Sequence, residues 1–339
     1  MPLGTAADFR AVTFVDADRG WIVGGKWDIA GGLIGRTLDR GLSWKFTSGI
    51  VSDEAGGRRC PLVGVRFVDA RSGVALGSCG AALTTLDGGE HWSADRKPAY
   101  LQLFSIGFAD AERGWAIGES GLLATVDGGS SWSIVRDDER RAISGRSVQR
   151  IGSVLWVVGQ RGKLARSDDD GRTWSALDVP LVNGSRPELR ALHFVDALHG
   201  WTVGQDGTIL ATRDGGASWT LQDTRIGDAR SAPKLDEIAG ANGVRKIDTG
   251  DRTPGLTLAA VRFVDAQRGW VAGHYANFAR SLILGTADGG TTWRLEADIA
   301  GEELRALGGD ATALWAVGER TREGMQSIYR RALSGPPTN

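Results

Sequence analysis

Apolar and polar positions alternate along this chain in a motif that returns at intervals. It reads Val-x-Phe-Val-Asp-Ala-x-x-Gly-Trp-x-Val-Gly, and its alternation around Phe and then around Trp predicts two strands. The Asp-Ala-x-x-Gly segment between them predicts a tight turn. Full or variant copies span residues 12–24, 65–77, 106–118, 192–204 and 261–273, and shortened copies span 155–159 and 314–318. The motif is therefore present seven times.

A second motif, Ser/Thr-x-Asp-x-Gly-x-x-Trp, follows six of these copies. Its Asp carboxylate suits backbone N–H donors of a turn, and its Gly suits a positive φ. The Trp restarts the apolar pattern, so the motif predicts a hairpin anchored by a buried indole. We call this second motif the Asp box. We expect its six carboxylates to have a structural role in turns, and they are those of Asp39, Asp87, Asp127, Asp169, Asp214 and Asp288.

Together the two motifs supply four strands in about 40–45 residues, which is the size of a propeller blade. The sequence predicts an all-β chain, a seven-bladed β-propeller of four-stranded blades with Asp-box hairpins. We expect one domain over 1–339, with blades near 8–50, 60–97, 101–137, 147–179, 188–223, 257–298 and 302–333 and an insertion at 224–256.

The last blade is expected to be irregular because it has no Asp box. Propellers usually complete such a blade with a strand from the other terminus. Met1 falls late in that expected strand, which points to residues upstream of it. A three-stranded last blade is the alternative.

Composition narrows the classes of partner. Gly supplies 50 of the 339 residues, as turns in every repeat require. The 40 basic and 41 acidic residues give no overall field that favours nucleic acid. No apolar run is long enough to cross a bilayer, so we expect no direct membrane insertion. We expect a monomer.

The paired motifs, for example 261–273 followed by 286–293, resemble the Asp-box (bacterial neuraminidase) repeat propellers. More narrowly, they resemble the photosystem II stability/assembly factor family of bacteria and chloroplasts. The likeness covers essentially the whole chain. It implies a non-catalytic propeller that binds other proteins while a membrane complex is assembled or stabilised.

Three arginines mark a candidate binding surface at the start of the first strands. Arg10 and Arg190 stand four residues before the repeat Phe, and Arg305 takes the matching place in the last blade. Guanidiniums that converge there suit carboxylates or an acidic peptide, because each offers a planar fork of donors. The alternative is that they pair with neighbouring acids such as Glu188 or Glu303.

Three aromatic residues mark a second candidate surface. The turn between the second and third strands is expected to be enlarged at 26–32, 274–280 and 319–326, on the face opposite the Asp boxes. Extended loops on a rigid scaffold often carry recognition. Trp27, Tyr275 and Phe278 would then be anchors for a protein partner. The alternative is that each only holds its own loop.

The two cysteines, Cys60 and Cys79, fall on one face of the second blade. A disulfide between them would favour an oxidising compartment, the periplasm or a lumen. Two free thiols are the alternative, and the start Met1-Pro2-Leu3-Gly4 has no signal-peptide core, which leaves the cytoplasm open. The four scattered histidines and the acidic run at 168–170 predict no metal site and no cofactor.

Three functional classes follow. The first is a protein-binding scaffold or assembly factor, whose partner is a membrane-complex subunit or its acidic segment. The second is a permanent extrinsic subunit of such a complex. The third is a glycoside hydrolase of sialidase type, which needs a Tyr nucleophile, and Tyr100, Tyr275 and Tyr329 are expected in loops or the irregular last blade.

Overall fold

The computed structural model places most of the repeats. It describes residues 8–26, 31–48, 60–78, 80–95, 102–119, 121–136, 143–182, 184–222, 255–275, 280–300, 302–310, 312–320 and 328–333. The chain forms two compact units. We call 7–159 with 163–177 the N-terminal unit, and 1–6, 160–162 and 178–339 the C-terminal unit, and describe each by itself.

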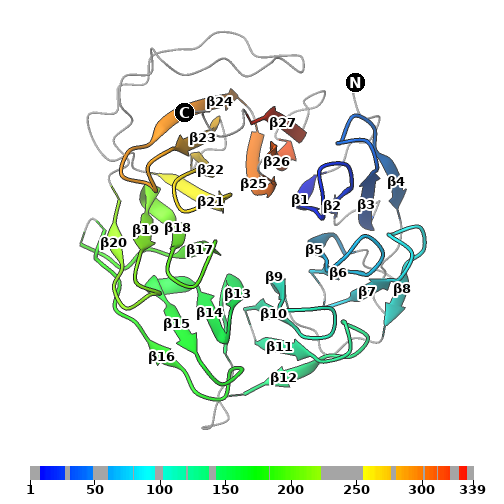
Figure 1. Ribbon diagram of the computed structural model, residues 1–339, viewed down its shortest axis with the longest axis horizontal. Helices are drawn as coiled ribbons and strands as arrows, with labels where there is room; N and C mark the ends of the chain where they lie inside the picture. The colour runs from blue at the N-terminus through cyan, green and yellow to red at the C-terminus, as the bar shows by residue number, and fades with distance from the viewer. Residues whose placement is uncertain are drawn as a thin grey trace. The chain divides into compact units, whose positions relative to one another are not determined.

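The N-terminal unit contains four antiparallel sheets of four strands, and every strand pairs with the next one in sequence (Figure 1). The strands are β1 (Phe9–Phe14), β2 (Gly20–Lys26), β3 (Gly31–Thr37), β4 (Lys45–Ser48), β5 (Leu62–Phe67), β6 (Gly73–Gly77), β7 (Ala82–Thr85), β8 (Ser93–Asp95), β9 (Leu103–Phe108), β10 (Gly114–Gly118), β11 (Leu122–Thr125), β12 (Ser133–Val135), β13 (Ser147–Ile151), β14 (Val154–Val158), β15 (Leu164–Ser167) and β16 (Ser175–Ala176). Each sheet is one blade, numbered 1 to 4 in chain order.

The C-terminal unit contains blades 5 to 7. Its strands are β17 (Leu189–Phe194), β18 (Gly200–Gly204), β19 (Ile209–Thr212), β20 (Thr220–Leu221), β21 (Leu256–Phe263), β22 (Gly269–Tyr275), β23 (Arg280–Thr286), β24 (Arg294–Ala300), β25 (Glu302–Gly309), β26 (Ala313–Arg320) and β27 (Ile328–Ala332). The 3-10 turns η1 (Gln160–Gly162) and η2 (Gln205–Gly207) follow β14 and β18. Among the described residues blade 7 has three strands, β25 to β27. The predicted fold class, a seven-bladed β-propeller with an irregular last blade, is confirmed.

Aromatic packing explains why Phe and Gly-Trp recur together. The Trp21 indole of blade 1 stacks on Phe67 of blade 2, with ring centroids 3.5 Å apart. In the C-terminal unit Trp201 stacks on Phe263 in the same way, again at 3.5 Å. The Phe rings also cover the motif glycines: a Cβ on Gly200 would lie 2.4 Å from the Phe194 ring. Blades 2 and 6 thus bury their Phe against their own Gly and against the Trp of the preceding blade.

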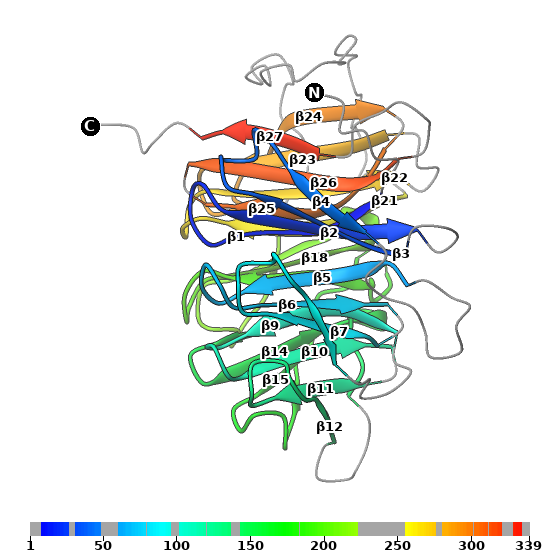
Figure 2. The ribbon, with the colours of Figure 1, turned by 90° about the vertical axis from the view of Figure 1, so that its right-hand side faces the viewer.

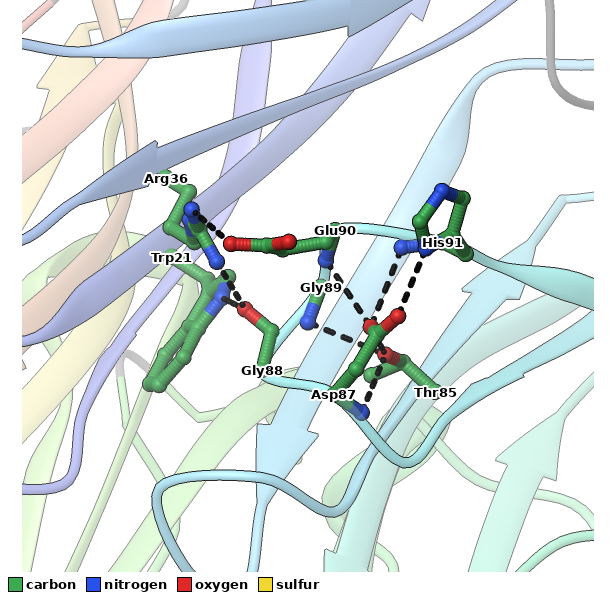
Figure 3. Close-up of polar contacts among 8 residues, drawn as sticks. All are labelled: Trp21, Arg36, Thr85, Asp87, Gly88, Gly89, Glu90 and His91. Carbon is green, nitrogen blue, oxygen red and sulfur yellow. Dashed lines mark hydrogen bonds and ion pairs between the residues drawn. The ribbon is translucent and has the colours of Figure 1, made fainter.

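The Asp boxes form the tight turns that the sequence predicts (Figure 3). In all six, the Thr or Ser hydroxyl donates to the Asp carboxylate at 2.7–2.9 Å. The backbone N–H four residues after the Asp also donates to that carboxylate, at 2.8–3.0 Å. In five blades, a backbone N–H of the box donates to a carbonyl of the turn between the first and second strands. These two turns therefore share one face of each blade.

The boxes also join neighbouring blades. The Trp21 indole donates to the Gly88 carbonyl of the next box at 2.9 Å, and Arg36 reaches Glu90 of that box at 3.0 Å (Figure 3). In the C-terminal unit, the Trp201 indole donates to the Gly289 carbonyl at 3.1 Å. The Trp that anchors one blade is thus held by the turn of the next blade.

All three of the enlarged turns are shorter than predicted. In blade 7, β26 continues to Arg320, and Glu319 pairs with Glu303. His274 and Tyr275 lie in β22, where they pair with Thr257 and Leu256, so the turn that was expected to begin at His274 begins after Tyr275. In blade 1, β2 and β3 continue to Lys26 and Gly31. The prediction was wrong because the hairpin ladder continues beyond the Gly that closes the motif.

Candidate functional site

The three predicted arginines occupy one recurring feature, a β-bulge in the first strand of a blade. The pairing with the second strand skips one residue in six blades, and the skipped residues are Arg10, Val63, Phe104, Arg190, Ala259 and Arg305. A bulge leaves one residue out of the ladder and redirects its side chain. The position four residues before the repeat Phe, at which the sequence analysis found the arginines, is therefore the position of the bulge.

The closing Gly of the motif permits this bulge. A Cβ on Gly204 would lie 2.0 Å from the Glu188 carbonyl oxygen, and one on Gly318 would lie 2.2 Å from that of Glu303. Only Gly allows the first strand to approach so closely just before its bulge. The local sequence therefore fixes where Arg190 and Arg305 leave the sheet.

In the C-terminal unit, both arginines have acidic partners. Arg190 lies 3.1 Å from Glu188, whereas Arg305 lies 2.8 Å from Glu303 and 3.2 Å from Glu319. The pairing that the sequence analysis gave as the alternative is thus present. The two arginine side chains remain 31 % and 30 % exposed, so part of each side chain stays open to solvent.

His274 is buried, and its Nε2 lies 3.3 Å from a carboxylate oxygen of Glu303, which also pairs with Arg305. Burial first, and then the charges of Arg305 and Arg190, lower the pKa of His274 to about 4. The imidazole is therefore neutral near pH 7. We call Glu188, Arg190, His274, Glu303, Arg305 and Glu319 the Arg–Glu–His cluster.

His274 and Glu319 were missed as site residues because they fell within turns that were expected to be enlarged. Both stand immediately after the closing Gly of the motif, at Gly273 and Gly318. Gln205 has the same position in blade 5, where its side chain accepts a hydrogen bond from the Glu188 N–H at 3.3 Å. The position directly after this Gly therefore identifies side chains that contact the first strand of a blade, and the sequence alone could have located it.

In the N-terminal unit, Arg10 is partly exposed at the bulge of β1. Blade 4 contributes an arginine that the sequence analysis missed. The Arg146 guanidinium lies 4.3 Å from the centre of the Phe104 ring, which is at the bulge of blade 3. Arg146 precedes β13 at the place that Arg10 has in blade 1. It was missed because blade 4 has Arg150 where blades 1, 2, 3, 5 and 6 have the reference Phe.

The other predicted site residues are placed as follows. Tyr275 is in β22, half-buried against the core of blades 5 and 6, and not in a loop as predicted. Burial raises the pKa of its hydroxyl. Trp27 and Phe278 lie outside the described residues, so their role as anchors stays a prediction. Cys60 is buried and disulfide-bonded, while Cys79 also lies outside the described residues.

The Asp-box carboxylates are engaged in their turns. Hydrogen bonds from Ser218 and Thr212 lower the pKa of Asp214 to about 2, and those from Thr173 and Ser167 do the same for Asp169. Within the described ranges, no three His, Cys, Asp or Glu side chains gather as a metal site would require. In that same part of the chain, no helix is long and apolar enough to span a bilayer.

Sequence comparison relates the chain to proteins of one kind. The family model described as photosynthesis system II assembly factor YCF48 matches residues 58–140 and 97–189. Over 231 residues, 54% of this chain, it is 27% identical to the photosystem II assembly lipoprotein Ycf48 of Synechococcus sp. strain CC9902. Over 113 residues, 31% of this chain, it is 34% identical to the Ycf48 protein of Synechococcus sp. strain JA-2-3B'a(2-13). These matches span 66% and 33% of the two relatives' own lengths.

Solved structures share the fold over almost the whole chain. YCF48 bound to a D1 peptide matches with a TM-score of 0.70 at 18% identity, covering 98% of this chain and 94% of that one. YCF48 from Cyanidioschyzon merolae gives 0.70 at 17% identity, covering 98% and 97%. A GH74 enzyme from Niastella koreensis gives 0.51 at 12% identity, covering 96% and 53%. The chain is thus a β-propeller that resembles photosystem II assembly factors, in sequence over part of its length and in fold over almost all of it.

Proposed function

We propose that this chain is a non-catalytic scaffold that binds a protein partner during the assembly or stabilisation of a membrane complex of photosystem type. One observation carries the proposal: two first-strand bulges hold Arg190 and Arg305, whose charges both act on the buried His274, and both arginines stay about one-third exposed. A rigid pair of guanidiniums suits carboxylates of an acidic segment. The likeness to assembly factors supports this reading.

The carboxylates of the Arg–Glu–His cluster determine how such a segment would bind. Glu319 and Glu188 each hold a guanidinium, so an incoming carboxylate must replace or share one of these contacts. The neutral His274 adds no positive charge near pH 7. Recognition then depends on geometry more than on net charge, which favours selectivity for a well-placed carboxylate.

A matched pair of variants tests this surface. The probe is a synthetic D1 peptide, chosen because a structural relative was solved with one, beside the same peptide with its Asp and Glu changed to Asn and Gln. Arg305→Gln should weaken binding of the acidic peptide by about tenfold, since it removes a charge-assisted contact. Glu319→Gln should strengthen it, because it removes one of the two carboxylates that hold the same guanidinium. Equal affinities for wild type and both variants would contradict the proposal.

The physiological partner is addressed by affinity capture from native membranes. We expect wild type to retain a membrane-complex subunit that an Arg10, Arg190, Arg305 to Ala variant loses. A Trp27, Tyr275, Phe278 to Ala variant tests the aromatic surface in the same way. A partner that stays bound in the mature complex would show a permanent extrinsic subunit instead of an assembly factor.

We propose an extracytoplasmic location and a monomeric state. The bonded Cys60 supports an oxidising compartment, and one relative is named a lipoprotein. Turnover of xyloglucan oligosaccharides or of a fluorogenic sialoside, lost on replacing one carboxylate, would overturn the non-catalytic reading. The GH74 likeness at 12% identity extends to the fold alone.

A further inference from the structure

The Asp boxes of blades 1 to 3 carry aliphatic side chains that project into solvent. Leu38, Leu86 and Val126 stand between the Thr and the Asp of their boxes and are 57%, 75% and 75% exposed. Leu42, in the box of blade 1, is 73% exposed. The neighbouring Thr side chains are buried and the Asp carboxylates turn into the box, so the residue between them must point outward. We call these four side chains the tip residues.

The tip residues are held by rigid turns of one unit. Blades 1, 2 and 3 lie side by side in the N-terminal unit, where their first strands β1, β5 and β9 are in contact. The turns of these blades end on the left in Figure 2. The box of blade 2 is bonded internally and also to Trp21 and Arg36 of blade 1 (Figure 3). The tip residues therefore stand on hydrogen-bonded turns of neighbouring blades.

The fold does not require an apolar residue at these positions. In the other three boxes the residue between the Ser or Thr and the Asp is Asp168, Arg213 or Ala287. Those boxes keep the same hydrogen bonds. The fold therefore does not explain why exposed aliphatic side chains take this position in three consecutive blades, and grouped exposed apolar side chains mark interaction sites.

The surroundings of the tip residues are acidic. The turns of blades 1 to 3 at 16–19, 38–43, 69–72, 86–91, 110–113 and 126–131 contain nine carboxylates and four arginines. Hydrogen bonds within the turns lower the pKa values of Asp16, Asp39, Asp69, Asp110 and Asp127, so these groups stay charged. An anionic bilayer, or the same surface of a second copy, would be repelled.

We propose that the tip residues form a docking surface for a cationic amphipathic protein segment. Its apolar side chains would contact Leu38, Leu42, Leu86 and Val126, while its Lys and Arg side chains face the turn carboxylates. The surface lies on the Asp-box side of its blades, whereas the bulges that carry the arginines lie at the opposite end of the first strands. It is thus independent of the proposed acidic-partner site.

Binding of a labelled synthetic helical peptide of Leu and Lys to the full chain tests this surface, beside a peptide in which Ser replaces every Leu. We expect the Leu/Lys peptide to bind at least about tenfold more tightly than the Ser/Lys peptide. The variant Leu38→Ser, Leu86→Ser, Val126→Ser should lose that difference. The matched control is Arg213→Ser with Ala287→Ser, which changes the same box position in other blades and should bind as wild type does.

Three results would overturn the proposal. The first is equal affinity for the two peptides, and the second is a triple variant that melts as wild type does and keeps the tenfold difference. The third is binding to phosphatidylglycerol vesicles, or formation of a dimer, that the triple variant abolishes, since the tip residues would then serve a bilayer or a second copy. Loss of D1-peptide binding alone bears only on the Arg–Glu–His cluster.

Discussion

At the scale of single residues, the Asp-box carboxylate holds its turn. Asp214 accepts hydrogen bonds from the Thr212 hydroxyl, the Ser218 N–H and the Ser218 hydroxyl, at 2.8, 2.9 and 2.6 Å. All three favour the ionised form, which is why its pKa falls to about 2. The aspartate thus acts as a fixed acceptor and has no proton to exchange near neutral pH.

Asp214→Asn should lower the thermal midpoint at pH 7 by a few degrees, since the amide is a weaker acceptor. The folded pKa lies below the unfolded value of 3.8, so the carboxylate stabilises the fold above pH 4 and loses this effect as pH falls toward 2. Thermal melts between pH 7 and pH 2 measure both effects. The variant should show a shallower fall in midpoint below pH 4, and parallel curves for variant and wild type would contradict this.

His274 predicts a second pH dependence, in a different window. Its folded pKa of about 4 lies below the unfolded value near 6.5, so the unfolded chain binds the extra proton between these values. Stability is therefore complete above pH 6.5 and falls as pH drops toward 4, by at most about 1.4 kcal/mol per pH unit. Urea unfolding of wild type and His274→Gln measures this, and the variant should lose the slope in that window. The exposed His91 replaced by Gln is the matched control and should keep it.

At the scale of elements, the hairpin turn of one blade serves the preceding blade. The Trp201 indole crosses to the Gly289 carbonyl, and its ring covers Phe263. Where the following blade has no box, the indole has another partner: Trp270 donates to Glu296, which also pairs with Arg331 of β27. The missing box is thus replaced by a carboxylate and an arginine.

Trp201→Phe tests the role of this contact. It should destabilise the protein by about 1–3 kcal/mol, because the buried Gly289 carbonyl loses its donor and the stack on Phe263 shrinks. Urea titration gives the change. Trp293→Phe is the control: its ring is equally buried against Phe263, but its indole N–H has no acceptor among the described residues. Equal losses for the two variants would show that ring area, and not the hydrogen bond, decides stability.

The sequence predicts these elements well where every blade repeats the same residue. The Asp turns and the seven blades follow from positions that recur, whereas the stacking of a Trp on the Phe of the next blade was not predicted from them. Arg146 was missed because Arg150, which lies 5.0 Å from the Trp115 ring, replaces the Phe used to align the blades. His274 was misplaced because strand pairing beyond Gly273 depends on neighbouring strands and not on the motif. Such contacts between blades have no local pattern.

At the scale of the whole molecule, the repeated residues build the scaffold. The positions that vary between blades determine which chemical groups the surface presents. Bulge positions hold Arg, Val, Phe or Ala, and box positions hold Leu, Val, Asp, Arg or Ala, while the hydrogen bonds around them stay the same. Two chemically different surfaces can therefore change independently. The identity of the partner depends on these variable positions, which a fold cannot specify.

The state of the two cysteines is a further prediction for the whole chain. Cys60 is bonded, and we expect Cys79 to be its partner. Titration of the denatured, unreduced protein should then find no free thiol. Reduction should lower stability by about 3 kcal/mol, as expected for a loop of about 20 residues. The control is a variant with both cysteines changed to Ser, which should not respond to reductant; two titratable thiols in protein produced in an oxidising compartment would contradict the pairing.

The indole that reaches into the next box gives these blades a direction. Trp21 donates its hydrogen bond to the box of blade 2, and Trp201 donates to the box of blade 6. In both pairs the indole of the earlier blade therefore depends on the turn of the later blade. A substitution that disrupts an Asp box should consequently destabilise the preceding blade in the chain more than the following blade. Amide exchange should then be faster in the blade on the N-terminal side of the altered box than in the blade on its C-terminal side. Local opening in these repeats would thus have a direction along the chain.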